Sequence, residues 1–210
     1  MRLYLASTSP ARLALLRAAG VEPLVLPSEV DEDAAVAAAE AARGAALSTP
    51  ELVLLLAEAK ARAVLERHGS EIDGLLLGGD SAFAFDGRSL GKPHEPAVAR
   101  ERWLAQRGRS GILHSGQVLI DARVSGSGTA VGAVASAEVS FVDDMTDAEI
   151  DAYVATGEPL QVAGAFTIDS LGGPFIERID GDPSTVVGLS LPRLRRQVRE
   201  LGVEWTALWA

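Results

Sequence analysis

Six polar side chains lie within otherwise apolar stretches of the sequence, and their types suit chemistry on phosphate groups. In chain order they are Ser7, Arg12, Glu32, Lys60, Asp80 and Lys92. Lysine and arginine hold phosphate oxygens through charge-assisted hydrogen bonds, each worth roughly 1.5–3 kcal/mol. Carboxylates hold a divalent metal ion and activate water. The set predicts metal-assisted attack on a polyphosphate, provided that the fold brings these residues together.

The first of these groups lies in a hydroxyl-rich turn between an expected strand, residues 3–6, and an expected helix that Pro10 opens and Gly20 ends. Ser9 is a natural N-cap, and proline suits the first helical position because no N–H is needed there. The helix dipole favours an anion at this end, and phosphate is the usual one. Arg12 opposes the dipole, and a bound anion would remove that conflict. Alternatively, Ser9 only caps the helix and Arg12 points to solvent.

Lys60 lies in the apolar stripe of another expected helix. Residues 48–51 (STPE) resemble a capping box, and the helix should run to about Arg67. Leu56, Lys60 and Val64 recur at a spacing of four, so they share one face. Because a buried ammonium needs an anionic partner, we expect an anion beside Lys60. Alternatively, the side chain extends past the neighbouring alanines to solvent.

Asp80 interrupts an apolar strand that is predicted over residues 75–85, LLLGGDSAFAF. An unpaired carboxylate in a core is costly, so Asp80 should be paired, bound to metal or placed at a strand end. The two glycines before it let a ligand or another backbone approach closely. A hairpin signal follows, and then the loop GKP, which carries Lys92 but lacks the Walker A pattern.

An acidic loop, residues 28–33 (SEVDED), contains Glu32. Its carboxylates can serve as the hard oxygen ligands that Mg²⁺ and Mn²⁺ require. Equally, they can be a solvated turn that supplies negative charge to the N-terminus of the next helix, which we expect over the alanine-rich residues 33–47.

Composition narrows the class of protein. The chain has 210 residues, a formal net charge of −10 and no cysteine. The charge argues against a general nucleic-acid binder, and the lack of cysteine excludes disulfides and thiolate metal sites. No apolar run is long enough to span a bilayer, so we expect a cytoplasmic protein without a membrane partner. We find no repeats or linkers, and therefore expect one domain over residues 1–210.

The remaining elements predict an α/β fold. Further strands are expected at residues 22–27 (buried), 111–121, 131–142 and 174–179, a turn at 181–183, and further helices at 96–106, 146–156 and 192–201. Strands and helices alternate first and a hairpin follows, which favours a mixed, extended sheet with flanking helices. Such sheets bind ligands at strand ends and loops, where the six polar residues lie.

Taken in order, these motifs resemble the Maf family, also called septum formation inhibitors, which are nucleoside triphosphate pyrophosphatases. The matching stretches are LASTSPARLALLRAAG, VDE at Val30–Glu32, LAEAKA around Lys60, GGDS, DGRSLGKP, EIDAYVATGEP and AGAFTIDSLGGPFIERIDGDPSTVVGLSLP. They lie between residues 3 and 201, and the ordered set is specific although no single motif is.

The resemblance implies a mixed-sheet α/β fold like that of inosine triphosphate pyrophosphatases, with a cleft between two lobes. It implies hydrolysis of a canonical or modified nucleoside triphosphate to the monophosphate and pyrophosphate with Mg²⁺ or Mn²⁺, and often a homodimer. By motif, Asp80 looks like the proton acceptor or a ligand of the metal that activates water, and Glu32 looks like a metal ligand. Phosphate contacts are implied for Ser7, Arg12, Lys60 and Lys92.

The chain departs from the family pattern at positions that bear on specificity. Ala11 replaces the first of two arginines that usually follow Ser-Pro, and Ser81 stands where threonine is common. At Asp169 the thymidine/uridine-type members carry glutamine and the 7-methylguanosine-type members carry glutamate. A carboxylate accepts from the two donors of a guanine edge, whereas glutamine also donates. Asp169 therefore leans away from the glutamine group but does not identify the base. Thr185 replaces a frequent asparagine.

A second class of function is a nucleotide-binding regulator of cell division or septum formation without important turnover. Binding alone has little use for a water-activating carboxylate, so the presence of Asp80 and Glu32 with the cations favours the enzyme. In the simplest alternative, each polar group is an ordinary cap or surface charge, which the ordered set of motifs makes improbable.

Overall fold

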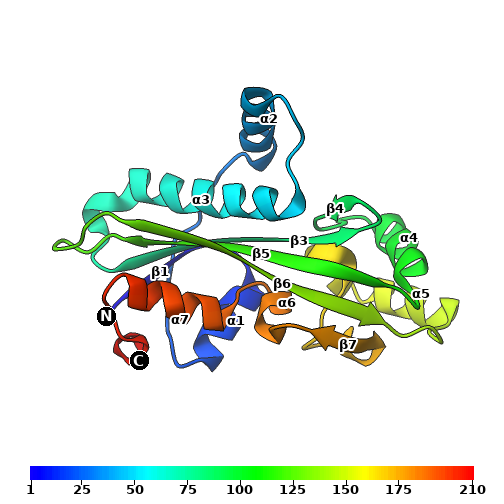
Figure 1. Ribbon diagram of the computed structural model, residues 1–210. Helices are drawn as coiled ribbons and strands as arrows, with labels where there is room; N and C mark the ends of the chain where they lie inside the picture. The colour runs from blue at the N-terminus through cyan, green and yellow to red at the C-terminus, as the bar shows by residue number, and fades with distance from the viewer.

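The computed structural model describes residues 1–210 as a seven-stranded mixed sheet with helices on both faces (Figure 1). The strands are β1 (Leu3–Ala6), β2 (Leu24–Val25), β3 (Leu75–Phe85), β4 (Arg88–Leu90), β5 (Ser110–Asp121), β6 (Ala130–Phe141) and β7 (Ile176–Asp180). The helices are α1 (Pro10–Ala18), α2 (Glu32–Arg43), α3 (Thr49–His68), α4 (Pro96–Gln106), α5 (Asp147–Ala155), α6 (Pro183–Val187) and α7 (Leu191–Glu200). None of the helices combines the length and apolar character of a membrane span.

The sheet order is β2-β1-β3-β5-β6-β7, with β4 paired to β3. β1 runs parallel to β2 and β3, whereas the β3–β4, β3–β5, β5–β6 and β6–β7 pairs are antiparallel. The expected mixed, extended sheet with flanking helices is therefore confirmed.

One edge of β3 is interrupted. β1 pairs with it over Leu75–Gly78 and β4 over Phe83–Phe85, so residues 79–82 have no strand partner on that side. On the opposite edge, β5 pairs with β3 continuously past these residues. The gap opens at the carboxyl end of β1, and Asp80 and Ser81 lie in it. Ligands of open α/β sheets occupy such positions.

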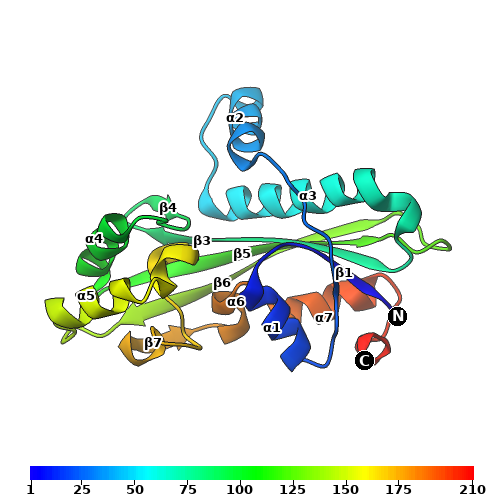
Figure 2. The same cartoon turned by 180° about the vertical axis from the view of Figure 1, so that it is seen from behind.

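Helix α3 lies along one face of the sheet, and α1, α6 and α7 lie on the other (Figures 1 and 2). The approach of α3 is close because glycines face it: a Cβ at Gly78 would lie 2.1 Å from the carbonyl oxygen of Ala57, and one at Gly116 would lie 2.3 Å from that of Val53. Lys60 follows Ala57 by about one helical turn. It is thereby placed directly over β3.

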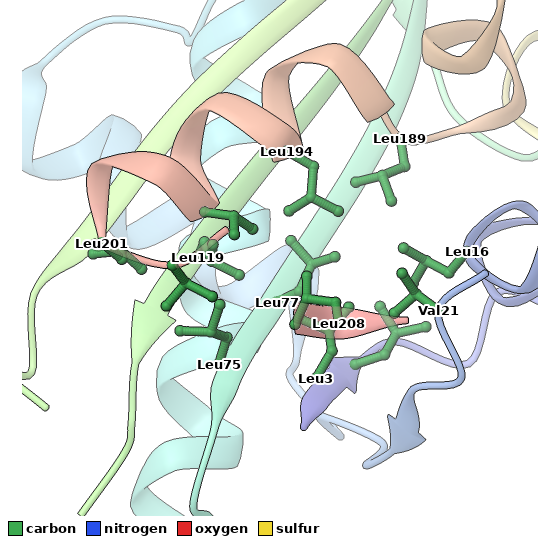
Figure 3. Packing of buried hydrophobic residues seen from close by; sticks show 13 residues of the cluster. Leu3, Leu16, Val21, Leu75, Leu77, Leu119, Leu189, Leu194, Leu201 and Leu208 are labelled. Carbon is green, nitrogen blue, oxygen red and sulfur yellow. The ribbon is translucent and has the colours of Figure 1, made fainter. Parts of the chain in front are cut away.

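Two large apolar clusters hold the two ends of the molecule. The first joins α1 and α7 to the sheet through buried leucines (Figure 3). The second surrounds Phe83 and Trp103 under α4 and α5, and Trp103 is fully buried with its indole N–H donating to the carbonyl oxygen of Ala165 at 2.7 Å. The gap in β3 lies between residues of the first cluster, such as Leu77, and residues of the second, such as Phe83.

Several predicted boundaries are confirmed, and two local predictions are wrong. The capping boxes at Ser48 and Thr146 are both present. However, the strand expected to be buried over residues 22–27 contains only Leu24 and Val25, which are 49% and 40% exposed because β2 is the sheet's edge. The turn expected at residues 181–183 continues into α6, which Asp182 caps.

Candidate active site

A cleft of about 1080 Å³ opens at the gap in β3. The residues singled out in the sequence, apart from Thr185, all line it: Ser7, Ala11, Arg12, Glu32, Lys60, Asp80, Ser81, Lys92 and Asp169. They come from the β1–α1 turn, α1, α2, α3, β3, the loop after β4 and the segment before β7. The fold therefore brings together residues that lie far apart in the sequence.

Lys60 joins two carboxylates at the centre of this cleft. Its Nζ donates to Oδ1 of Asp80 at 2.8 Å and contacts Oε1 of Glu32 at 2.7 Å. The side chains of Lys60 and Asp80 are 11% and 14% exposed, whereas that of Glu32 is 49% exposed. Lys60 thus has anionic partners, as expected of a lysine in an apolar stripe, and it does not extend past the alanines to solvent.

The surroundings of Asp80 change its acidity. Burial raises the pKa of this carboxyl above its ordinary value, and the charges of Lys60 and Arg12 oppose the rise. A carboxylate with a raised pKa is a stronger base than a solvated one, which suits it to accept a proton from water.

Arg12 is buried and held by neutral acceptors. Its Nε donates to the carbonyl oxygen of Gly188 at 2.8 Å, and its two terminal nitrogens donate to Oγ of Ser7 at 3.1 Å and Oγ of Ser81 at 3.0 Å. A Cβ at Gly79 would lie 3.1 Å from Nε, so that glycine leaves room for the guanidinium. The alternative that Arg12 points to solvent is wrong, although the expected Ser9 cap is present.

The charge of Arg12 has no hydrogen-bonded carboxylate to neutralise it. Burial lowers the pKa of Arg12, and the nearby charges of Asp80 and Glu32 oppose that change. Arginine remains protonated in proteins nonetheless. A buried guanidinium with only neutral acceptors is suited to meet an anion that enters the cleft.

The serines below Arg12 form a chain of hydrogen bonds across the sheet. Ser81 lies 2.8 Å from Ser115, Oγ to Oγ, and Ser115 donates to the carbonyl oxygen of Thr185 at 2.8 Å. The Thr185 hydroxyl itself donates to Asp182 at 3.0 Å, so it stabilises the start of α6. Ser81 therefore helps to orient the guanidinium of Arg12. The carbonyl oxygen of Thr185 accepts the hydrogen bond from Ser115, and the Thr185 hydroxyl holds this backbone in place through Asp182.

Lys92 follows β4 and Asp169 precedes β7, and both are exposed at the cleft wall. Neither takes part in an ion pair. Ala11 also lines the cleft, and its side chain is a single methyl group. None of these three residues has a side-chain hydrogen bond to Asp80, Lys60 or Glu32.

Sequence reasoning missed Gly188, whose carbonyl oxygen anchors Arg12. Its φ of +126° is a conformation that other residues rarely adopt. A glycine between Asp182 and Ser190, which start two successive helices, is the signal that points to this position.

The carboxylates fit a divalent cation. Asp80 and Glu32 both direct an oxygen at one cationic nitrogen, so two carboxylates converge on a single point. Mg²⁺ is commonly held by one or two carboxylates together with substrate phosphates and water. The structure contains no cluster of three or more acidic, histidine or cysteine side chains that could hold a metal ion.

Comparison with known proteins identifies the family. The model of the Maf-like protein family matches residues 2–201 of this chain. The chain belongs to the Maf family. Curated relatives named nucleoside triphosphate pyrophosphatase include proteins from Leifsonia xyli, Salinispora tropica and Streptomyces coelicolor, which are 69%, 53% and 51% identical to this chain. Each alignment covers 100% of this chain and, in the same order, 97%, 88% and 95% of the relative.

A solved structure of a nucleoside-triphosphatase, dITP/XTP pyrophosphatase, from Mycobacterium abscessus also matches. It is 16% identical, with a TM-score of 0.41, and the match covers 96% of this chain and 93% of that one.

Proposed function

We propose that this Maf protein hydrolyses a nucleoside triphosphate to the monophosphate and pyrophosphate. The observation that carries the proposal is the convergence of Asp80, Lys60 and Arg12 at the gap in β3. The curated relatives with 51–69% identity bear the name of this activity. Because the cleft draws on residues from Ser7 to Gly188, we further propose that the whole chain acts as one catalytic domain.

Arg12, Lys60 and Lys92 bind the phosphates in this proposal. Arg12 offers a guanidinium fixed by Ser7, Ser81 and Gly188, and Lys60 offers an ammonium that can exchange a carboxylate partner for a phosphate oxygen. Each such bond forms in a partly desolvated site, where charge-assisted contacts are strongest.

Asp80 accepts the proton of the attacking water. The water oxygen bonds to the α-phosphorus, the bond from that phosphorus to the oxygen bridging to the β-phosphate breaks, and pyrophosphate leaves. The raised pKa of Asp80 improves its strength as a base. Lys60 and Arg12 stabilise the charge that grows on the phosphate oxygens.

Asp80 and Glu32 would also hold a divalent cation such as Mg²⁺ or Mn²⁺. Such an ion offsets phosphate charge and polarises water when bound. Asp169, Ala11 and Ser81 are proposed to affect which nucleotide is preferred, since all three line the cleft.

The test is product analysis with the purified protein. Canonical and modified nucleoside triphosphates are incubated with Mg²⁺ or Mn²⁺, and pyrophosphate and orthophosphate are measured separately. Equal amounts of pyrophosphate and monophosphate support the proposal. Orthophosphate as the only released product would place the attack at the terminal phosphate and contradict it.

A further inference from the structure

Glu158, just beyond α5, gathers hydrogen bonds from five residues. Oε1 accepts from the Tyr153 hydroxyl at 2.9 Å, the Thr167 hydroxyl at 2.5 Å and the Gly172 N–H at 3.1 Å. Oε2 accepts from the Ser170 hydroxyl at 2.7 Å and the Leu171 N–H at 3.3 Å. Four of the five donors belong to residues 167–172, which we call the clamped loop.

The carboxylate is satisfied entirely by neutral donors, since Glu158 takes part in no ion pair. Burial alone would raise the pKa of Glu158, but the hydrogen bonds from Ser170, Thr167 and Tyr153 outweigh it and lower the pKa to about 2. The ionised form is therefore the one that the loop binds.

The loop is also closed tightly on itself. A Cβ at Gly172 would lie 2.6 Å from the Tyr153 hydroxyl oxygen and 2.7 Å from the carbonyl oxygen of Thr167, so only glycine fits there without movement. The Gly172 N–H donates a second time, to the Thr167 hydroxyl at 3.2 Å. Glu158 thus fixes both ends of the loop at once.

The clamped loop forms part of the cleft wall, through Thr167, Ile168 and Asp169. The segment before it packs on β3, where a Cβ at Gly164 would lie 2.8 Å from Cβ of Phe83. Phe83 is three residues beyond Asp80, a distance of about 10 Å along a strand. The loop therefore borders a region of the cleft away from the triad of Asp80, Lys60 and Glu32.

That region is chemically different from the charged centre. Leu113, Phe166 and Ile168 line it with apolar and aromatic surface, which suits a flat ring. Asp169 adds a carboxylate that can accept hydrogen bonds from the edge of such a ring.

We infer that Glu158 is a positioning residue that fixes the clamped loop against the nucleotide's base and thereby sets the discrimination between bases. The inference rests on the proposed function of the cleft. Glu158 does not line the cleft, so it acts through the loop and touches no reacting atom.

The variant Glu158→Gln tests this role with little change of shape. A carboxamide keeps one accepting oxygen but turns an NH₂ group toward donors that now lack an acceptor. KM should rise more than kcat falls. The ratio of kcat/KM between the best and the worst nucleotide should shrink by about tenfold. Amide exchange of residues 168–172 should become faster in the absence of nucleotide.

Glu149→Gln is the matched control. Glu149 caps the same helix α5 by accepting from the Thr146 N–H at 2.7 Å, and it has no hydrogen bond to the clamped loop. This variant should lower stability without changing nucleotide selectivity or exchange in the loop.

The inference is overturned if Glu158→Gln leaves loop exchange or nucleotide selectivity as in Glu149→Gln. Failure of the proposed function gives a different result, namely a wild-type protein that releases no pyrophosphate from any nucleotide. Loop exchange needs no turnover, so unchanged exchange in Glu158→Gln overturns the role of Glu158 in that case too.

Discussion

Asp80 and Glu158 are carboxylates in the same molecule whose surroundings shift their pKa values in opposite directions. Asp80 is buried beside cations and its pKa is raised, whereas Glu158 is wrapped by neutral donors and its pKa falls to about 2. Desolvation prevails at Asp80, and hydrogen bonding to the charged form prevails at Glu158.

The difference in surroundings suits Asp80 to catalysis and Glu158 to holding a loop in place. The partner of Asp80 is Lys60, a cation that it shares with Glu32, so an incoming phosphate or metal can take over the contact. The partners of Glu158 are the Tyr153 hydroxyl and four hydroxyl or backbone N–H donors of the clamped loop, so both of its oxygens are occupied. A carboxylate that can exchange its partner, such as Asp80, suits a reaction. A carboxylate whose oxygens are all hydrogen-bonded, such as that of Glu158, suits the fixing of a loop in the cleft wall.

The largest effect is expected from Asp80→Asn. Without a proton acceptor, kcat for pyrophosphate release should fall by about 10²–10⁴-fold. The fold should persist, because Lys60 keeps its contact with Glu32. Pyrophosphate release measures the loss of kcat, and thermal melting measures whether the fold persists. Near wild-type turnover would remove Asp80 from the mechanism.

Lys60→Met should come next, with kcat/KM lowered by about 100-fold through loss of a phosphate contact. The variant also removes the attraction that opposes the effect of burial on Asp80, so the pKa of Asp80 should rise further. The acidic limb of the kcat/KM profile should accordingly move to higher pH. An unmoved limb would show that Lys60 and Asp80 are not coupled during turnover.

Arg12→Lys keeps the charge but loses the planar fork that reaches Ser7, Ser81 and Gly188 together. We expect kcat/KM to fall by about 10–100-fold, the value of one charge-assisted contact. Steady-state kinetics with the preferred nucleotide checks this. Full activity would mean that charge alone suffices at this position.

The smallest expected effect is the pH-dependent contribution of Glu158 to the thermal stability of the fold. Because the pKa of Glu158 is lowered to about 2 in the folded protein, its contribution is complete above the ordinary value of 4.5 and is lost as the pH falls toward about 2. Glu158→Gln should melt below the wild type at pH 7, and the difference should narrow between about pH 4.5 and 2. Thermal melting across this pH range measures the difference. A difference in melting temperature that does not change with pH would contradict the conclusion that the loop binds the ionised form of Glu158.

Local structure was largely predictable from the sequence, because helix starts carry their own signals. Ser48 and Thr146 open helices with capping boxes, and Lys60 stands out within an apolar stripe whose period fixes its face. The need of a buried ammonium for an anion anticipated its pairing. The exposure of β2 was not predictable, since nothing in residues 22–27 distinguishes an edge strand from a central one.

Contacts between residues far apart in the sequence could not be predicted from local sequence patterns. Arg12 is held by the carbonyl oxygen of Gly188, 176 residues away, and the glycine at that position does not indicate which side chain its carbonyl oxygen meets. The residues beside Glu158 in the sequence do not indicate its role, because most of its partners lie in a glycine-rich loop that begins nine residues later. Both cases depend on the fold bringing backbone groups to a charged side chain.

The most direct test of the central claim is hydrolysis in ¹⁸O-labelled water, with mass analysis of both products. Attack at the α-phosphorus beside Asp80 predicts the label in the nucleoside monophosphate and none in pyrophosphate. Label in pyrophosphate or in orthophosphate would mean that the water attacks another phosphorus, and would contradict the account.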